Sequence, residues 1–186
     1  MERELVEAAR RGDRAAFDVL VRRKVESVYR TARAILGNDA DADDATQEAF
    51  VSAWRNLPRL REPERFDAWL GRIVVNACRQ VIRKRHGVRE IRMDTWDGGD
   101  SRSLVDAGSA RDSRRPDEEA IEAIAFDRAF ERLSIEDRSI LALHHADDLG
   151  LDEIAAVLGI PTGTVKSRLL RARRALERSL ERERPS

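Results

Sequence analysis

The apolar residues between Asp152 and Leu176 recur at intervals of three and four along the chain. Such spacing puts them on one face of a helix, so this stretch predicts two short amphipathic helices. The residues of the two apolar stripes are Ile154, Ala155, Leu158, Val165, Leu169, Ala172 and Leu176. Gly159 allows a left-handed helix end, Pro161 stops the first helix, and the hydroxyl of Thr162 can cap the second. The pattern therefore predicts a helix-turn-helix.

The second of these helices carries positive charge opposite its apolar stripe. The side chains on that face and its flanks are Lys166, Ser167, Arg168, Leu170, Arg171, Arg173 and Arg174. The whole chain has 35 basic and 35 acidic residues, so this charge reflects local concentration and not an overall basic composition. We expect the face to meet base edges and phosphates in a DNA major groove. The alternative is a solvated basic face on a helical domain.

The first half of the chain shows similar helical patterns separated by helix-ending residues. Gly12 ends a first helix, Asp13 can cap a second, and Gly37 can end it. Pro58 stops a third helix. The predicted helices run from about Glu2 to Arg11, from Asp13 to Leu36, from Asp41 to Leu57 and from Arg65 to Arg85. No alternation typical of strands is present, so the chain is predicted to be all-α.

The third and fourth helices differ in charge. Polar and cationic residues recur on the fourth at helical spacing, and this strip could follow a phosphate backbone or could be a solvated face. Its members are Arg72, Asn76, Arg79, Arg83 and Lys84. The third helix begins with acidic residues, which complement a helix dipole whatever their function. Its polar and aromatic residues include Asp41, Asp44, Gln47, Glu48, Phe50 and Trp54.

The periodic pattern is interrupted between His86 and Pro116, where glycine, serine and mixed charges prevail. Such a composition is typical of a flexible connector. The sequence therefore predicts two small helical domains, at 1–86 and 117–186, joined by a linker at 87–116.

The composition excludes several classes of function. The single cysteine, Cys78, cannot form an internal disulfide, and no apolar run approaches the length of a membrane span. We therefore expect a cytoplasmic protein without membrane insertion. His86, His144 and His145 have no metal-ligand spacing with Cys78, and no nucleophile–base set or glycine-rich phosphate loop is present. We expect no metal, no cofactor and no enzymatic activity.

Both predicted domains, in this order, resemble the extracytoplasmic-function sigma factors of bacterial RNA polymerase. The helix from Asp41 to Leu57 is similar to the region 2 segment that docks on the polymerase β′ coiled coil. The resemblance assigns that contact to Asp41, Asp44, Gln47, Glu48, Phe50 and Trp54. The helix beginning near Phe66 is similar to the segment that melts and reads the minus-ten promoter element. The residues so assigned are Trp69, Arg72, Asn76, Arg79, Gln80, Arg83 and Lys84.

The carboxyl-terminal helix-turn-helix is similar to region 4, which reads the minus-thirty-five element. The residues assigned to that contact are Thr162, Thr164, Lys166, Ser167, Arg168, Leu170, Arg171 and Arg173. Gly71, Val75 and Gln80 depart from the residues common in the family, which are aromatic, basic and acidic at these positions. Because of these differences, the resemblance does not decide which residues of the melting helix contact DNA.

The resemblance implies a protein that binds core RNA polymerase, at the β′ coiled coil and the β flap, together with promoter DNA. It also implies an anti-sigma partner. Catalysis by the chain itself is not implied. An alternative is a stand-alone helix-turn-helix regulator whose first domain senses a ligand, and a helical adaptor without affinity for DNA is a third class.

Overall fold

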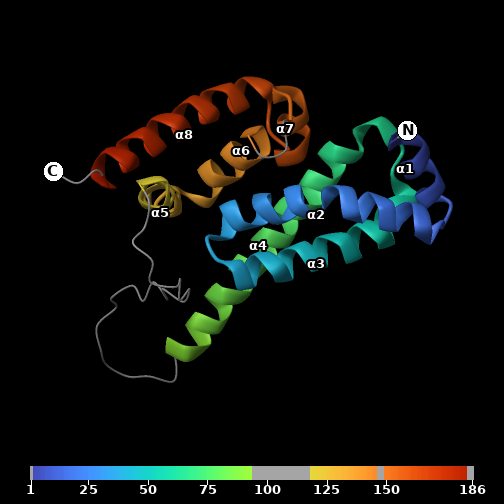
Figure 1. Ribbon diagram of the computed structural model, residues 1–186, viewed down its shortest axis with the longest axis horizontal. Coiled ribbons are helices and arrows are strands. Elements are labelled where there is room, and N and C mark those ends of the chain that lie inside the picture. Colours follow the sequence, from blue (N-terminus) through green and yellow to red (C-terminus); the bar gives the residue numbers. More distant parts are fainter. Residues whose placement is uncertain (1, 94–117, 146–148, 184–186) are drawn as a thin grey trace.

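The computed structural model describes residues 2–93, 118–145 and 149–183 (Figure 1). Within these ranges the chain forms α-helices, two short 3-10 helices and no strand, which confirms the all-α prediction. The α-helices are α1 (Glu2–Arg10), α2 (Arg14–Leu36), α3 (Asp39–Asn56), α4 (Phe66–Met93), α5 (Glu118–Glu131), α6 (Ile135–His145), α7 (Leu151–Leu158) and α8 (Thr162–Glu183). The 3-10 helices η1 (Leu57–Arg59) and η2 (Pro63–Arg65) connect α3 to α4. From residue 94 onward, the predicted linker lies outside the described residues.

The ends of the first helices follow the capping residues in the sequence. The Asp13 carboxylate accepts a hydrogen bond from the Ala16 N–H at 3.1 Å and so caps the start of α2. Gly37 ends α2 with a φ of 81°, a left-handed conformation that favours glycine. The Asn38 side chain then accepts the Asp41 N–H at 2.9 Å and caps α3. These caps agree with the predicted boundaries to within two residues.

Helix α4 is longer than the sequence pattern predicted. It was expected to end near Arg85, but it continues to Met93. Gly87 lies inside this helix, where a glycine costs about 1 kcal/mol relative to alanine. No proline occurs between residues 66 and 93, and a helix can continue beyond its last packed turn when no residue breaks it.

Helix α3 packs against both α2 and α4 through alanine. Its fully buried side chains are Ala42, Ala45, Ala49 and Ala53. They recur at helical spacing and form a stripe with almost no bulk, which lets the neighbouring helices come close. The largest fully buried side chains of the first domain lie outside α3, among them Leu20 and Ile35 on α2 and Val74 on α4. Any residue much larger than alanine on this stripe would overpack the domain.

The second domain is built around α8. Helices α5, α6 and α7 each pack against it. Its buried residues include Ile140, Leu143, Ile154, Val165 and Leu169. The sequence pattern predicted α7 and the start of α8, whereas α5 and α6 were not individually recognised.

The two domains also pack against each other. Helix α6 lies against α2, and α7 lies against α4 (Figure 1). The buried side chains of both domains belong to one continuous hydrophobic core. The sequence predicted two modules on a linker and did not predict this shared core.

Lys24 joins three helices of the first domain. Its Nζ lies 2.8 Å from Glu2 Oε1 on α1 and 2.7 Å from Asp67 Oδ1 on α4. Burial lowers the pKa of Lys24, but the hydrogen bonds with Asp67 and Glu2 outweigh it, so the pKa lies above the ordinary 10.5. A raised pKa in the folded state means that the ammonium stabilises the fold below pH 10.5. This contribution is lost as the pH rises through the folded-state pKa.

We expect Lys24→Met to lower the free energy of unfolding by about 1–2 kcal/mol at neutral pH, because Glu2 and Asp67 then face each other without a cation. The difference from the wild-type protein should shrink as the pH rises above 10.5 and the lysine loses its proton. Urea denaturation of both proteins at neutral pH and above pH 10.5 measures this. Arg3→Met removes two exposed ion pairs, with Glu7 and Glu64, and serves as the control, with a much smaller expected effect. Equal losses for the two variants would contradict the proposed role of Lys24.

Cys78 is fully buried in the core of the first domain. Burial raises the pKa of its thiol to about 12. Since the thiolate is the reactive form, we expect iodoacetamide to leave Cys78 unmodified in the native protein at about pH 8 and to modify it readily in denaturant. Mass spectrometry of the intact chain measures both rates. Rapid labelling of the native protein would show that the core opens around this residue.

Candidate nucleic-acid interface

The turn between α7 and α8 has the geometry of a tight helix-turn-helix. Gly159 has a φ of 67° and donates its N–H to the Ala155 carbonyl, which ends α7. The Pro161 carbonyl accepts the N–H groups of Thr164 at 2.8 Å and Val165 at 3.1 Å, so the hydrogen-bond ladder of α8 begins there. Gly159 therefore has the role that the sequence predicted, whereas α7 ends before Pro161, whose carbonyl begins α8.

Thr162 has a different role from the predicted one. It is the first residue of α8, and its hydroxyl donates a hydrogen bond to Asp152 Oδ1 at 2.8 Å. The hydroxyl thus does not cap its own helix, and the prediction of a Thr162 cap was wrong. The contact ties the start of α8 to the first turn of α7. Glu153 also supports that turn, since its carboxylate accepts the Gly150 N–H at 2.8 Å.

One face of α8 is buried and the opposite face is exposed. Val165, Leu169 and Ala172 are buried against the rest of the domain. The predicted contact residues on the exposed side are Lys166, Ser167, Leu170 and Arg171. Leu170 leaves 53% of its surface exposed, which is unusual for a large apolar residue and suits contact with a thymine methyl group.

Asp137 on α6 lies beneath the exposed face of α8. Its side chain is only 14% exposed, and its Oδ1 lies 3.6 Å from an Nη of Arg171. The carboxylate attracts the guanidinium toward α6. Sequence reasoning missed Asp137, because its partner lies 34 positions away in the sequence and no local pattern connects the two residues.

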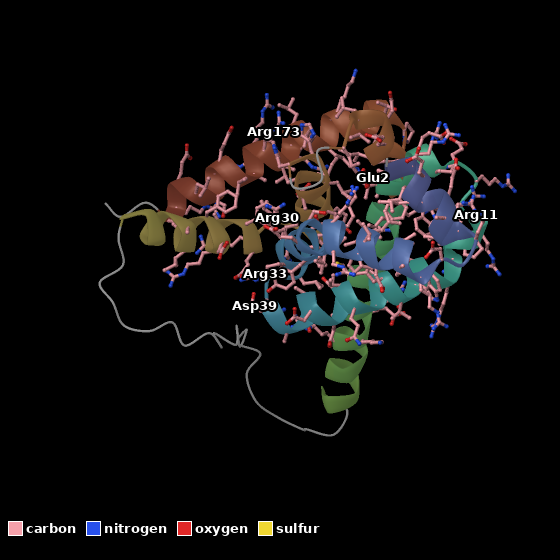
Figure 2. The ribbon with its side chains drawn as sticks, turned by 45° about the vertical axis from the view of Figure 1, so that its right-hand side comes forward. Glu2, Arg11, Arg30, Arg33, Asp39 and Arg173 are labelled. Carbon is pink, nitrogen blue, oxygen red and sulfur yellow. The ribbon has the colours of Figure 1, made fainter. Side chains whose placement is uncertain are left out.

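The other predicted contact residues of α8 differ in their surroundings. Thr164 and Arg168 are half-buried. Arg173 lines a groove of about 950 Å³ between the domains, which Arg30 and Arg33 of α2 also line. Figure 2 labels these three arginines, with Arg173 on α8 and the other two on the opposing helix. Arg33 is paired with Asp39 through a 2.7 Å contact.

The predicted strip on α4 is exposed on the first domain. Its exposed members are Arg72, Asn76, Arg79, Gln80, Arg83 and Lys84. Trp69 is half-buried, and its ring lies 5.9 Å from that of Phe66. Gly71 and Val75, which depart from the family pattern, are both buried. Gly71 is covered by Leu143, Leu149 and Val157 of the second domain.

Residues from α3 and α4 together line a second groove, of about 720 Å³. The α3 side contributes the predicted docking residues Asp41, Asp44, Gln47 and Glu48. The α4 side contributes Gln80, Lys84 and Arg85 among others, above a floor that includes Val51, Ala77 and Val81. An ion pair between Arg85 and Asp41 crosses the groove. The structure thus brings part of the predicted docking set and part of the predicted minus-ten set to one place.

Phe50 and Trp54 are half-buried on α3 and are not among the residues of this groove. Phe50 packs against the hydrophobic core, and the Trp54 ring lies 4.9 Å from that of Phe17 on α2. Their aromatic rings are therefore partly used by the fold.

The described residues offer little for other chemistry. Among residues 2–93, 118–145 and 149–183, no helix is both long and apolar enough to cross a membrane. The same ranges hold no group of three His, Cys, Asp or Glu side chains that could bind a metal ion.

The chain matches two families of known sequence. The family described as sigma-70 region 2 matches residues 20–87, and the family described as sigma-70, region 4 matches residues 123–176. The chain is 36% identical over 179 residues to the ECF RNA polymerase sigma factor SigM of Mycobacterium tuberculosis, with 95% of this chain and 83% of SigM covered. It is 32% identical over 181 residues to the ECF RNA polymerase sigma-E factor of Escherichia coli, with 95% and 93% covered.

A solved structure has a similar fold over nearly its whole length. CnrH, determined in complex with the cytosolic domain of CnrY, superposes with a TM-score of 0.68 at 27% identity and covers 98% of this chain and 99% of its own. Sequence and fold therefore agree across both domains, and the chain belongs to the ECF RNA polymerase sigma factors of the sigma-70 family.

Proposed function

We propose that this sigma factor reads the minus-thirty-five element with the exposed face of α8 and the minus-ten element with the strip on α4, while α3 docks on core RNA polymerase. The observation that carries the proposal is the exposed cationic face of α8, whose other side packs against α5, α6 and α7 and whose first residue is joined to α7 by the Thr162–Asp152 hydrogen bond. A helix presented in this way fits a major groove. The proposed domains are 1–86 and 117–186, with 87–116 as the linker.

On α8, Lys166, Ser167, Leu170 and Arg171 would meet base edges. Arg168, Arg173 and the backbone N–H groups of Thr162 and Gly163 would bind phosphates, since the first N–H groups of a helix lack partners within it. Asp137 would hold the Arg171 guanidinium and limit the directions in which it reaches DNA.

On the first domain, the exposed cations of α4 would bind the phosphates of the opened strand, and Trp69 would offer a ring on which a base can stack. The acidic edge of the α3–α4 groove, at Asp44 and Glu48, would meet basic residues of core polymerase. Phe50 and Trp54 would support α3 from its buried side and add apolar contact at its margin.

The function needs binding and no covalent chemistry by the chain, so we infer a non-enzymatic protein that works in the cytoplasm, where core polymerase and promoters are found. CnrH was solved with the cytosolic domain of CnrY. By analogy, we infer an anti-sigma partner for this chain.

The test uses core polymerase with and without the full chain on genomic DNA of the source organism, with the 5′ ends of transcripts mapped. We expect the chain to add discrete start sites that core polymerase alone ignores. Two variants separate the proposed surfaces. Asp44→Lys with Glu48→Lys should weaken binding to core polymerase, whereas Lys166→Ala with Arg171→Ala should leave that binding intact and lose the start sites. A set of start sites unchanged by the addition of the chain would refute the proposed function.

Gly163 provides a separate prediction for the start of α8. A Cβ at this position would meet no atom within 4 Å, so Gly163→Ala should leave the fold intact or stabilise it by up to about 1 kcal/mol. We expect the added methyl group to hold phosphate away from the N–H groups of α8, and the holoenzyme to bind promoters that have a minus-thirty-five element about tenfold less tightly. Thermal unfolding and promoter competition measure the two effects. Unchanged promoter affinity would show that DNA does not approach this turn closely.

A further inference from the structure

Asp137 places a carboxylate at the contact between α6 and α8, two helices that lie side by side (Figure 1). Its Oδ1 is shielded from water and accepts no hydrogen bond from the residues that the structure describes. Burying a carboxylate oxygen without a hydrogen bond is unfavourable, so this atom does not contribute to the fold in the usual way.

The start of α6 does not account for this atom. The Ser134 hydroxyl oxygen accepts the Asp137 N–H at 3.1 Å, and the Ser134 carbonyl accepts the Arg138 N–H at 2.9 Å. In a capping box, the side chain of the third helical residue would return a hydrogen bond to the backbone of the capping residue. Oδ1 of Asp137 makes no such bond. An acidic residue in the first turn complements the helix dipole, but the exposed Glu136 also supplies that charge.

The cation that faces Oδ1 of Asp137 is Arg171 on α8. An Nη of Arg171 lies 3.6 Å from this oxygen, and the Arg171 side chain is 64% exposed. A hydrogen bond between such charged groups would be about 2.7–2.9 Å long, so the contact is an attraction without a fixed direction. Coulomb attraction falls only with the inverse of distance, and it persists when the guanidinium moves by about an ångström. Arg171 is therefore held near α6 and can still turn toward a ligand.

We propose that Asp137 is a positioning residue that makes Arg171 prefer a base edge to a phosphate. This inference rests on the proposed function. The guanidinium has several N–H donors in one plane, so one edge can stay beside Asp137 while another donates a pair of hydrogen bonds to guanine O6 and N7. A phosphate at the margin of the groove would draw the guanidinium away. The Asp137 carboxylate would then face the negative DNA backbone without its cation, which is unfavourable.

This arrangement affects specificity more than affinity. Contacts to phosphates are available on every DNA sequence, whereas contacts to base edges distinguish one sequence from another. By disfavouring the phosphate contact of Arg171, Asp137 reduces binding to DNA that lacks the correct base pair. Loss of its charge should therefore relax the base preference of the minus-thirty-five contact.

The first experiment uses holoenzyme made from core polymerase and the full chain, on promoters mapped with the wild-type protein. Each base pair of the minus-thirty-five element is changed in turn, and promoter competition measures the preference. We expect Asp137→Asn to lower the preference about fivefold, at the same base pair where Arg171→Ala lowers it. The other base pairs should be unaffected. In the Arg171→Ala background, Asp137→Asn should change nothing further.

The matched control is Glu136→Gln, which removes an equal charge from the neighbouring, exposed position of α6. We expect it to keep the base preference of the parent chain. On random-sequence DNA, Asp137→Asn should steepen the salt dependence of binding by about one phosphate contact, because Arg171 is then free to take one. Glu136→Gln should leave the slope unchanged. A base preference in Asp137→Asn equal to that of the parent chain would overturn the proposal.

Thermal unfolding separates positioning from a structural role. Because Oδ1 of Asp137 has no hydrogen bond to lose, we expect Asp137→Asn to melt within a few degrees of the parent chain. A large fall in melting temperature, with an equal loss of affinity at every base pair, would assign Asp137 to the fold and refute the positioning role.

The second experiment examines the free chain and does not depend on transcription. Nuclear magnetic resonance measures the rotation of the Arg171 guanidinium about its Nε–Cζ bond, with the signal assigned by its loss in Arg171→Lys. We expect slower rotation in the parent chain than in Asp137→Asn. Equal rotation would refute the hold of Asp137 on Arg171. Failure of the wild-type chain to start any transcript would refute the proposed function, and in that case the rotation rates still decide whether Asp137 holds Arg171.

Discussion

Close helix packing through residues with little or no side chain governs this structure. Along α3, a stripe of four buried alanines lets α2 and α4 pack closely against the same helix. On α4, Gly71 lets a whole second domain come within contact distance. At both crossings, the bulky apolar groups belong to the partner helix. Each interface therefore depends on its small residues as well as on the large side chains around them.

The chemistry of local helix ends explains why most of the fold could be predicted. Asp13, Gly37, Gly159 and Pro161 each act within a few residues of their own position, so their roles can be read from the sequence. Thr162 shows the limit of such reasoning. Its hydroxyl could have capped its own helix, but it donates a hydrogen bond to Asp152, which lies ten positions away on α7.

The same distinction separates the site residues that could be predicted from those that could not. The exposed cations of α8 and α4 follow from helical periodicity, since a face opposite an apolar stripe is solvated. The Asp137–Arg171 contact and the gathering of three arginines between the domains depend on tertiary packing. No spacing in the sequence indicates them. Gly71 and Val75 differ from the residues common in the family at these positions. Both positions are buried in this structure.

The continuous hydrophobic core has a thermodynamic consequence for the molecule as a whole. Leu143 and Leu149 lie where the second domain meets α4, so loss of either domain removes apolar cover from the other. Burying one such leucine contributes about 1.5–3 kcal/mol, and a few of them amount to a sizeable share of the stability of a typical protein. The two halves of the chain are therefore expected to be coupled in unfolding and to melt as one cooperative unit.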